Sequence, residues 1–329
     1  MGEARPVIEV VGLKKYFPLP RRYPGQPVSR VHAVDGVSFT IGRGETLALV
    51  GESGCGKSTV GRTILGLLKP TAGEVRLDGE RIDSLSAGRL RPLRRRMQVV
   101  FQDPFSSLNP RLRVREILAE PLANFSLART RGEFSARIAG LLEKVRLPAD
   151  AAARFPHEFS GGQRQRIGIA RALATAPEVI ICDEAVSALD VSVKAQIVNL
   201  LADLQDELGL SLLFITHDLA IVEHLTHRVA VMYLGRIVEE ADRRSLFARP
   251  WHPYTQALLS AVPVPDPAAS RRRTILKGDV PSPIALPTGC RFHTRCPHAF
   301  ARCRTEEPEL RPVGDTQRVA CHLEVRPGE

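Results

Sequence analysis

A short glycine-rich segment carries the residue types that bind the phosphates of a nucleotide. Gly51-Glu-Ser-Gly-Cys-Gly-Lys-Ser58 fits the pattern G-x-x-x-x-G-K-[ST] and directly follows the apolar run TLALV. In such a loop, backbone N–H groups and a helix start surround phosphates, Lys57 reaches the terminal ones, and the Ser58 hydroxyl ligates Mg²⁺. The alternative is a glycine-rich turn before a helix, but strand, loop and helix occur in the order that the motif requires. The sequence therefore predicts a nucleotide-binding site.

Two adjacent carboxylates end a second apolar run. Val179-Ile-Ile-Cys-Asp183-Glu184 predicts a buried strand whose last two residues point to opposite faces. Asp183 is then placed to hold the water shell of Mg²⁺, and Glu184 to polarise the water that attacks a γ-phosphate. An apolar strand that ends in two acids is common by itself. Together with the upstream phosphate loop, it predicts hydrolysis of the bound nucleotide.

Four of the six cysteines lie near the end of the chain. Cys290, Cys296, Cys303 and Cys321 are separated by five, six and seventeen residues. Thiolates are soft ligands, and four of them complete a tetrahedral or cluster site, so the group suggests metal binding. An iron–sulfur cluster, zinc and reduced free thiols are the alternatives, and the spacing differs from the C-x-x-C of zinc ribbons.

Other residues near these sites have plainer interpretations. Cys55, in the phosphate loop, and Cys182, on the buried strand, are expected to pack in the core. Arg291 and Arg295 flank the first cysteines of the tail, where they either neutralise thiolate charge or face solvent. The sequence does not decide between these two interpretations.

Strands and helices must hold the residues of these predicted sites in place. Apolar runs at 37–50, 179–184, 211–216 and 228–234 alternate with helical segments, a pattern typical of βα units around a mainly parallel sheet. The stretch over about 104–176 is Arg-rich and helical in pattern, which indicates a helical insertion. Proline-rich stretches at 262–267 and 281–287 follow a change of composition near residue 250. We expect an α/β domain over 1–250 and a small cysteine-rich domain over 251–329.

Composition and the distribution of apolar residues exclude an integral membrane protein. The chain has 329 residues, enough for about two domains, and its 46 Lys and Arg against 36 Asp and Glu give a net charge of +10. This balance favours anionic partners: phosphates, nucleic acid or lipid headgroups. The sequence has no apolar run of roughly 18 residues, the length of a membrane span, and its start lacks a signal-peptide pattern. We therefore expect a cytosolic protein whose cysteines are not paired as disulfides.

One further segment indicates a family. Phe159-Ser-Gly-Gly-Gln-Arg-Gln-Arg166, followed by IGIARAL, resembles the signature motif of ATP-binding cassette (ABC) ATPases. The resemblance covers about residues 7–250, and the other motifs of the family occur in order. Gln102 matches the Q-loop glutamine, Ser187-Ala-Leu-Asp190 matches the D-loop, and His217 matches the switch histidine.

One position matches the family less closely than the others, and another differs from the family. Tyr16 lies where the family keeps an aromatic residue that stacks on adenine, although the neighbouring Phe17 is an alternative. Ala185 follows the acidic pair where the family usually has proline. Because the carboxylates are intact, we expect the alanine to tune hydrolysis without abolishing it.

The resemblance implies a P-loop ABC ATPase domain, with a mainly parallel sheet, antiparallel strands and a helical signature subdomain. It implies ATP and Mg²⁺ as ligands. The implied catalytic residues are Glu184, His217 and Gln102, and the implied magnesium residues are Ser58, Gln102 and Asp183. The implied nucleotide contacts are Tyr16, Gly51, Glu52, Ser53, Gly54, Cys55, Gly56, Lys57, Ser58, Thr59, Gln102, Ser160, Gly161, Gly162, Gln163, Asp183 and Asp190.

The tail, with the stretch His252 to Leu259, is similar to the C-terminal extension of oligopeptide and dipeptide importer ATPases. This similarity implies a four-iron four-sulfur cluster on Cys290, Cys296, Cys303 and Cys321, and a role in peptide import. There are three alternatives. The chain could serve the uptake of nickel, glutathione or a sugar, it could be a redox sensor controlled by the cluster, or it could be a soluble ABC ATPase that acts on nucleic acid.

The family resemblance also implies partners. They are two membrane permeases, a second cassette subunit bound head to tail, expected to be a paralogue, and indirectly an extracytoplasmic substrate-binding protein. No nucleic acid partner is expected. Residues 102–113 correspond to the segment that contacts the permease, and the implied location is the cytoplasmic face of the inner or plasma membrane.

Overall fold

The computed structural model describes residues 5–21, 28–103, 107–262 and 276–326. The chain forms two compact units. Unit 1 consists of Met1–Ile8, Ile41–Thr46 and Arg76–Ile215, and unit 2 consists of Glu9–Thr40, Leu47–Val75 and Thr216–Glu329. Residues 104–106 of the expected permease-contact segment, and 263–267 of the first proline-rich stretch, lie outside the described residues.

Among its described residues, unit 1 contains three strands that pair in parallel, the short strand β5 and a set of helices. Its elements are β5 (Glu80–Arg81), α2 (Ala87–Arg94), β6 (Met97–Val100), α4 (Val114–Asn124), α5 (Arg131–Lys144), η1 (Ala149–Ala153), η2 (Pro156–Glu158), α6 (Gly161–Leu173), β7 (Val179–Asp183), α7 (Val191–Leu208) and β8 (Ser211–Thr216). β7 pairs in parallel with β6 and with β8. All five residues of β7 are buried, as expected of an apolar strand that is covered on both faces.

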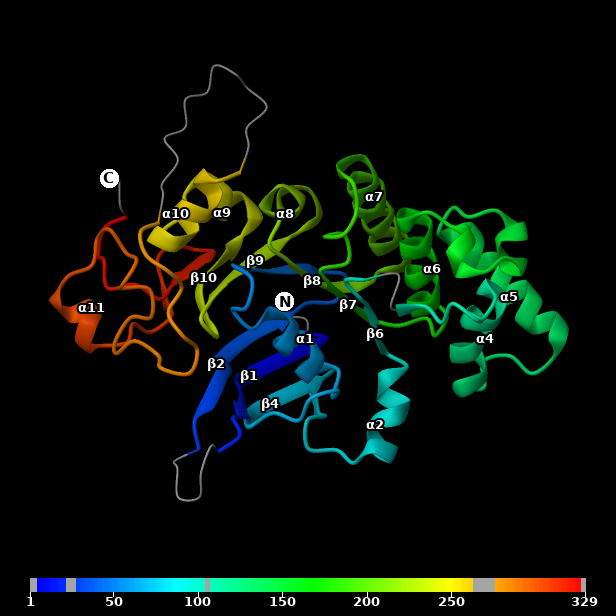
Figure 1. The fold of residues 1–329 in the computed structure, drawn as a ribbon, viewed down its shortest axis with the longest axis horizontal. Coiled ribbons are helices and arrows are strands. Elements are labelled where there is room, and N and C mark those ends of the chain that lie inside the picture. Colours follow the sequence, from blue (N-terminus) through cyan, green and yellow to red (C-terminus); the bar gives the residue numbers. More distant parts are fainter. Residues whose placement is uncertain (1–4, 22–27, 104–106, 263–275, 327–329) are drawn as a thin grey trace, which may run out of the picture. The chain divides into compact units, whose positions relative to one another are not determined.

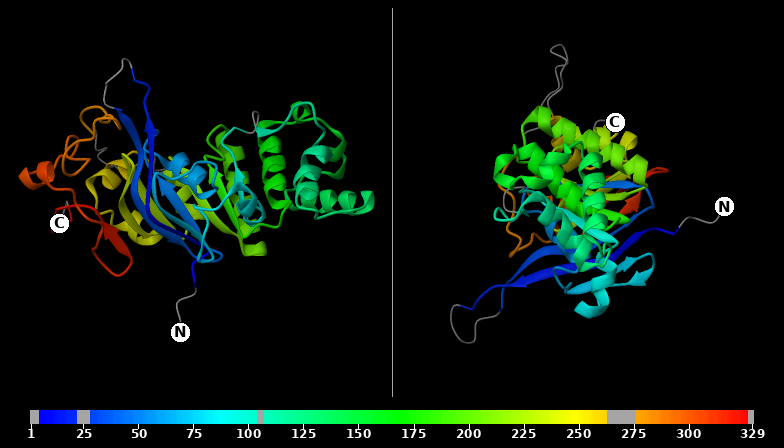
Figure 2. Two further views of the ribbon diagram at one scale, coloured as in Figure 1. Left: turned by 90° about the horizontal axis from the view of Figure 1, so that it is seen from below. Right: turned by 90° about the vertical axis from the view of Figure 1, so that its right-hand side faces the viewer.

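The helices of unit 1 that follow β6 pack on one another. α4, α5 and α6 are in mutual contact, and α6 also contacts β6 and α7. They form the cyan and green helical group in Figures 1 and 2. The buried side of α6 includes Ile167, Ala170 and Leu173, whose spacing of three residues keeps them on one face. This helix begins at the signature segment, so its packing fixes where that segment lies within unit 1.

Unit 2 contains the remaining strands. Its elements are β1 (Ile8–Pro18), β2 (Arg30–Ile41), β3 (Thr46–Val50), α1 (Lys57–Ile64), β4 (Ala72–Leu77), α8 (Leu219–Leu225), β9 (Arg228–Tyr233), β10 (Arg236–Asp242), α9 (Arg243–Ala248), α10 (Pro253–Ser260), α11 (Ala301–Thr305), β11 (Arg311–Pro312) and β12 (Gln317–Val319). β3 pairs in parallel with β9, and β10 pairs antiparallel with β9 and β12. β1 lies between β2 and β4. The strand pairs of β3, β9, β10 and β12 therefore include both parallel and antiparallel ones.

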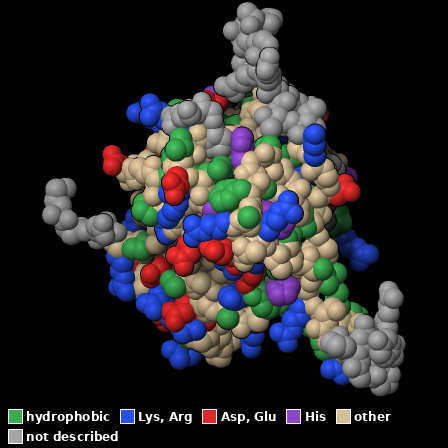
Figure 3. All heavy atoms as spheres, turned by 90° about the vertical axis from the view of Figure 1, so that its left-hand side faces the viewer, with side chains coloured by type: hydrophobic (Ala, Val, Ile, Leu, Met, Phe, Trp, Pro, Cys, Tyr) green, Lys and Arg blue, Asp and Glu red, His purple; other side chains and the backbone are tan. Residues whose placement is uncertain are grey.

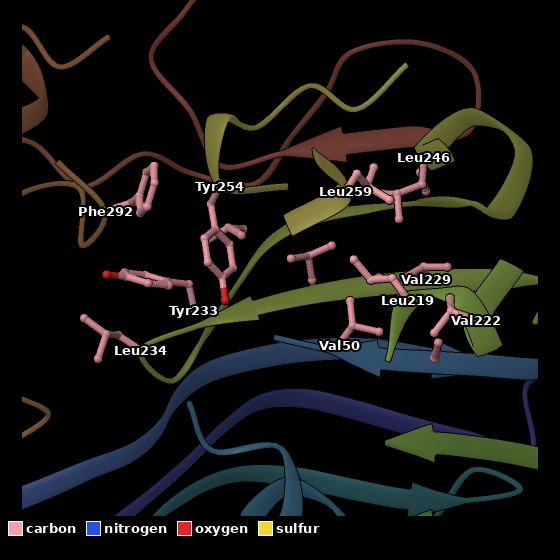
Figure 4. Close-up of a cluster of buried hydrophobic side chains, with 14 residues drawn as sticks. Val50, Leu219, Val222, Val229, Tyr233, Leu234, Leu246, Tyr254, Leu259 and Phe292 are labelled. Carbon is pink, nitrogen blue, oxygen red and sulfur yellow. The ribbon is translucent and has the colours of Figure 1, made fainter. Parts of the chain in front are cut away.

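An apolar core joins the end of β3 to the C-terminal elements of unit 2. It contains Val50 from β3, Val231 and Tyr233 from β9, Tyr254 from α10, and Phe292 from the tail, with other aliphatic side chains (Figure 4). The phosphate loop follows Val50 directly, so this core supports it. In the part of the chain that the structure describes, no helix is long and apolar enough to cross a membrane.

Candidate functional site

The phosphate loop (residues 51–58) lies in unit 2 and leads into α1. Two of its glycines are required by close backbone contacts. A Cβ at Gly51 would lie 2.2 Å from the Met232 carbonyl oxygen, and one at Gly56 would lie 1.9 Å from that of Ala33. Gly56 also has a φ of +107°, a left-handed conformation that L side chains rarely adopt. The loop is therefore held in one shape by the strands around it.

The Lys57 side chain lies across this loop. It is only 3% exposed, and its Nζ donates hydrogen bonds to the carbonyl oxygens of Gly51 at 2.8 Å and Glu52 at 2.9 Å. α1 begins at Lys57, so Ser58 and Thr59 stand in its first turn, where N–H groups and the helix dipole favour an anion. Unit 2 thus brings the predicted phosphate-binding residues together.

Cys55 is part of the loop, and its sulfur accepts a weak hydrogen bond from Lys57 Nζ at 3.8 Å. Its side chain is buried, and burial raises the pKa of the thiol. Burial also raises the pKa of Cys182, to about 12. Both cysteines pack in the interior, as the sequence predicts.

In unit 1, Gln102 and Glu184 are in direct contact. The side-chain Nε2 of Gln102 donates a hydrogen bond to Glu184 Oε2 at 2.9 Å. Glu184 has a φ of +50°, which is uncommon for a residue with a side chain. Its N–H donates to the Ile215 carbonyl at 2.9 Å, and its carbonyl accepts from the N–H and hydroxyl of Ser187 at 3.0 Å each. These bonds hold the carboxylate at the end of β7.

Asp183 is the last residue of β7 and is 6% exposed. Ala185, which stands where proline was expected, is buried. The following D-loop leads to the exposed Asp190, which is the N-cap residue of α7. Unit 1 therefore brings both carboxylates and the Q-loop glutamine to one end of β7.

The signature segment of unit 1 starts α6 with a capping box. Ser160 Oγ accepts a hydrogen bond from the Gln163 N–H at 3.3 Å, and the Ser160 N–H donates to Gln163 Oε1 at 3.0 Å. A Cβ at Gly162 would lie 2.4 Å from Val193 Cγ1, so this glycine allows α6 to approach α7 closely. Gly161, the first residue of α6, precedes it.

Two further predicted residues lie in unit 2. His217 is exposed and stands just before Asp218, whose side chain caps α8. The phenol of Tyr16 donates a hydrogen bond to Asp35, and its ring lies 4.3 Å from that of His32. Burial, together with Asp35, raises the pKa of Tyr16 to about 12, so its hydroxyl stays protonated.

The cysteine group (Cys290, Cys296, Cys303 and Cys321) is gathered in unit 2. Burial raises the pKa of Cys290 to about 12, and the charges of the other three cysteines add to the rise. The Cys290 N–H donates to the Cys303 carbonyl at 2.9 Å. Burial raises the pKa of Cys296 to about 11 and also raises that of Cys321, and backbone N–H groups two positions ahead of Cys290, Cys296 and Cys321 offset only part of the rise. Two of the four cysteines, Cys290 and Cys303, are thus joined through their backbones.

The arrangement alone does not form a metal centre. Among the described residues, no group of three or more His, Cys, Asp or Glu side chains has an arrangement that could hold a metal ion.

Figure 3 views the side on which α11 lies, and there Lys and Arg side chains are interspersed with Asp and Glu.

Sequence reasoning missed two contacts of the phosphate loop. Tyr254 Oη accepts a hydrogen bond from the Glu52 N–H at 2.9 Å. Arg295 donates to the Glu52 carboxylate, at 2.8 Å from Nη1 and 3.3 Å from Nη2. Arg291 forms a buried ion pair with Asp35. Neither arginine is simply solvated, which answers a question that the sequence left open.

Two protein-family models match the chain. The family described as "ABC transporter" matches residues 34–187. The family described as "Oligopeptide/dipeptide transporter, C-terminal region" matches residues 238–303, which include three members of the cysteine group.

Curated relatives are similar over nearly the whole chain. A protein of Sinorhizobium fredii named as a probable peptide ABC transporter ATP-binding protein is 56% identical over 317 residues, 96% of this chain and 90% of that protein. The oligopeptide transport ATP-binding protein AppF of Bacillus subtilis is 51% identical over 320 residues, 96% of this chain and 97% of that protein.

Solved structures are similar over about three quarters of the chain. The ATP-binding cassette MJ0796, described as a dimer in a post-hydrolysis state with ADP and phosphate, is 30% identical with a TM-score of 0.64, over 72% of this chain and 99% of that chain. The protein cbiO1 of Clostridium perfringens, part of an ABC transporter complex, is 29% identical with a TM-score of 0.63, over 74% of this chain and 91% of that chain.

Proposed function

Because the chain belongs to the ATP-binding subunits of the oligopeptide and dipeptide ABC transporters, we propose that it binds and hydrolyses ATP to power peptide import. Its fold is that of an ABC ATPase, with mixed sheets and helices. One observation carries the proposal: 56% and 51% identity to peptide transporter ATP-binding proteins over 96% of the chain.

We propose that the chain consists of two regions. An ATPase domain spans residues 1–250, with a helical signature subdomain at about 104–176, and an extension spans 251–329. In the ATPase domain, Lys57 and the N–H groups at the start of α1 bind the phosphates. By the family resemblance, Ser58, Gln102 and Asp183 are the residues that would hold Mg²⁺, since a hydroxyl, an amide oxygen and a carboxylate are hard ligands, and the ion would neutralise phosphate charge.

Glu184 is the proposed general base, because it can accept a proton from the water that attacks the γ-phosphate. Gln102, hydrogen-bonded to that carboxylate at 2.9 Å, orients it. His217 contacts the γ-phosphate in this assignment, and Tyr16 stacks on adenine. The signature residues Ser160 to Gln163 offer the start of α6 to the nucleotide of a second cassette, which makes the active protein a dimer.

The transporter context follows from the family. We propose that the subunit associates with two permeases and a paralogous cassette at the cytoplasmic face of the membrane, and that a substrate-binding protein delivers the cargo. Closure on ATP and opening after hydrolysis would drive the permeases between two states. The net charge of +10 suits an anionic membrane surface.

We also propose that the cysteine group holds a four-iron four-sulfur cluster. Four cysteines of unit 2 supply the type of ligand that such a cluster uses. When bound, the cluster would cross-link the segments that carry the four cysteines.

Reconstitution in lipid vesicles tests the proposed function. The chain is assembled with its partner cassette and permeases, and ATP hydrolysis is measured with binding protein loaded from a peptide panel. Vesicles without binding protein are the control. We expect stimulation by peptides; stimulation only by nickel, glutathione or a sugar would retain the ATPase and reject peptide import.

Metal analysis tests the cluster. Protein purified without oxygen should be brown and contain about four irons per chain. Cys290→Ser should lose the iron, whereas Cys182→Ser, a buried cysteine outside the group, should retain it. Colourless protein with stoichiometric zinc would reject the cluster.

A further inference from the structure

One residue of the phosphate loop, Glu52, is fixed by contacts at all three of its polar groups. Its carbonyl accepts a hydrogen bond from Lys57 at 2.9 Å, and its N–H donates to Tyr254 at 2.9 Å. Its carboxylate accepts from Arg295 at 2.8 Å. Two of these three contacts come from elements after residue 250, which belong to the C-terminal region and not to the loop.

The contact with Tyr254 acts on the position of Lys57. The Gly51 carbonyl and the Glu52 N–H belong to one planar peptide group. The carbonyl end accepts from Lys57 at 2.8 Å, and the N–H end donates to Tyr254 at 2.9 Å. Rotation of this peptide would break both bonds together. Tyr254 therefore orients an acceptor that holds the lysine.

Tyr254 is itself held rigidly. It is fully buried, and its ring lies 4.7 Å from that of Tyr233 and 5.4 Å from that of Phe292 (Figure 4). Its N–H donates to His252 Nδ1 at 3.0 Å, which fixes the start of α10. Phe292 belongs to the cysteine loop (residues 290–296), so this loop supports the tyrosine that contacts the phosphate loop.

The same cysteine loop supplies Arg295. The arginine side chain is 9% exposed and the Glu52 side chain 28% exposed, so the pair is largely shielded from water. Such charged hydrogen bonds are stronger than neutral ones, and loss of one partner leaves a charge that is poorly solvated. The cysteine loop therefore contacts the phosphate loop in two ways: through Arg295 directly and through Phe292 by way of Tyr254.

We propose that Arg295 and Tyr254 are positioning residues for ATP binding, through which the C-terminal cysteine loop holds the phosphate loop and Lys57 in their binding geometry. The inference rests on the proposed ATP-binding function. Neither residue touches the reacting atoms; both act through Glu52. Their loss should therefore raise the KM for ATP more than it lowers kcat.

Three substitutions in the full-length chain test this role. Arg295→Gln and Glu52→Gln remove the charge from either side of the ion pair, and Tyr254→Phe removes only one hydroxyl. Each should raise the KM for ATP by about tenfold, with a much smaller change in kcat. Arg295→Lys should restore part of the affinity. Arg302→Gln, which breaks an exposed ion pair with Glu306 in the same region, is the control and should bind ATP as the wild type does.

A double substitution distinguishes positioning through Glu52 from separate effects. The double variant Glu52→Gln, Arg295→Gln should have a KM for ATP no higher than that of the single variant with the higher KM. Both substitutions remove the same interaction, so their effects should not add. Additive losses, or single variants that fold and keep the wild-type KM, would overturn the inference. Since Tyr254→Phe changes only one atom of the side chain, it tests the role even where Arg295→Gln does not fold. Wild-type protein that fails to bind ATP would instead reject the proposed function.

Discussion

The Gln102 amide donates a hydrogen bond to the Glu184 carboxylate at 2.9 Å in unit 1. Glu184 adopts a φ of +50°, and hydrogen bonds with Ile215 and Ser187 hold its backbone. The bond orients the carboxylate, as the proposed role of Glu184 as general base requires.

Glu184→Gln should keep ATP binding but lower the rate of hydrolysis about a hundredfold or more, because an amide cannot accept the proton. The glutamine can still bond to Gln102, so the fold should be retained. Phosphate release and nucleotide binding are measured in parallel. Glu207→Gln, at an exposed glutamate paired with Lys144, is the control. Hydrolysis at the wild-type rate would show that the general base is another residue.

Lys57→Ala should weaken ATP binding by at least about tenfold, because it removes a charged donor worth roughly 1.5–3 kcal/mol. It also leaves the carbonyls of Gly51 and Glu52 without this partner. Lys144→Ala removes an exposed lysine and should have little effect. Titration with a fluorescent ATP analogue checks both. Equal affinities of the two variants would contradict the assignment of Lys57.

The buried His252 should make stability fall in acid. Burial lowers its pKa from 6.5 to about 3, so between these values the unfolded chain binds a proton that the folded chain does not. The free energy of unfolding should therefore decrease as pH falls from about 6.5 towards 3, by up to about 1.4 kcal/mol per pH unit from this group.

His252→Asn isolates this contribution. Asparagine can cap α10 as His252 does, by accepting from the Tyr254 N–H, but it does not titrate. Urea unfolding of both proteins between pH 7 and 4 should give a shallower pH dependence for the variant. If the two slopes coincide, His252 is not neutral in the fold.

Arg291→Ala should destabilise unit 2. Asp35 is buried, and burial alone would raise its pKa, yet bonds from Tyr16 and Arg291 and the charges of Arg291 and Arg236 hold it at about 2. Removal of Arg291 leaves a buried carboxylate with weaker compensation, at a cost of about 3 kcal/mol. Denaturant unfolding measures the change. Arg302→Ala, at an exposed pair, should cost less than about 1 kcal/mol; similar values for both would refute the role of Arg291.

The parts of the site that the sequence predicts are those encoded by neighbouring residues. The phosphate loop and the acidic end of β7 are short motifs, and their apolar strands are buried as expected. Strand bounds are less well predicted: β1 extends from Ile8 to Pro18, and its second half contains half-buried polar residues such as Lys14 and Lys15, which form no apolar run.

Contacts between distant residues leave no local pattern. Glu52 and Arg295 are separated by 243 positions, and nothing in the spacing of the cysteines indicates that an arginine among them contacts the phosphate loop. Gly51, Lys57 and Asp183 lie in short local motifs, whereas Tyr254, which supports the phosphate loop, is 202 positions from its partner Glu52.

The buried thiol of Cys55 affects how the protein can be labelled. Because burial raises its pKa, this sulfur is not the reactive thiolate at neutral pH. Maleimide and iodoacetamide reagents therefore should not alkylate the phosphate loop of the folded chain. A dye attached to a cysteine introduced on the exposed surface could report on nucleotide binding while the native loop stays unmodified.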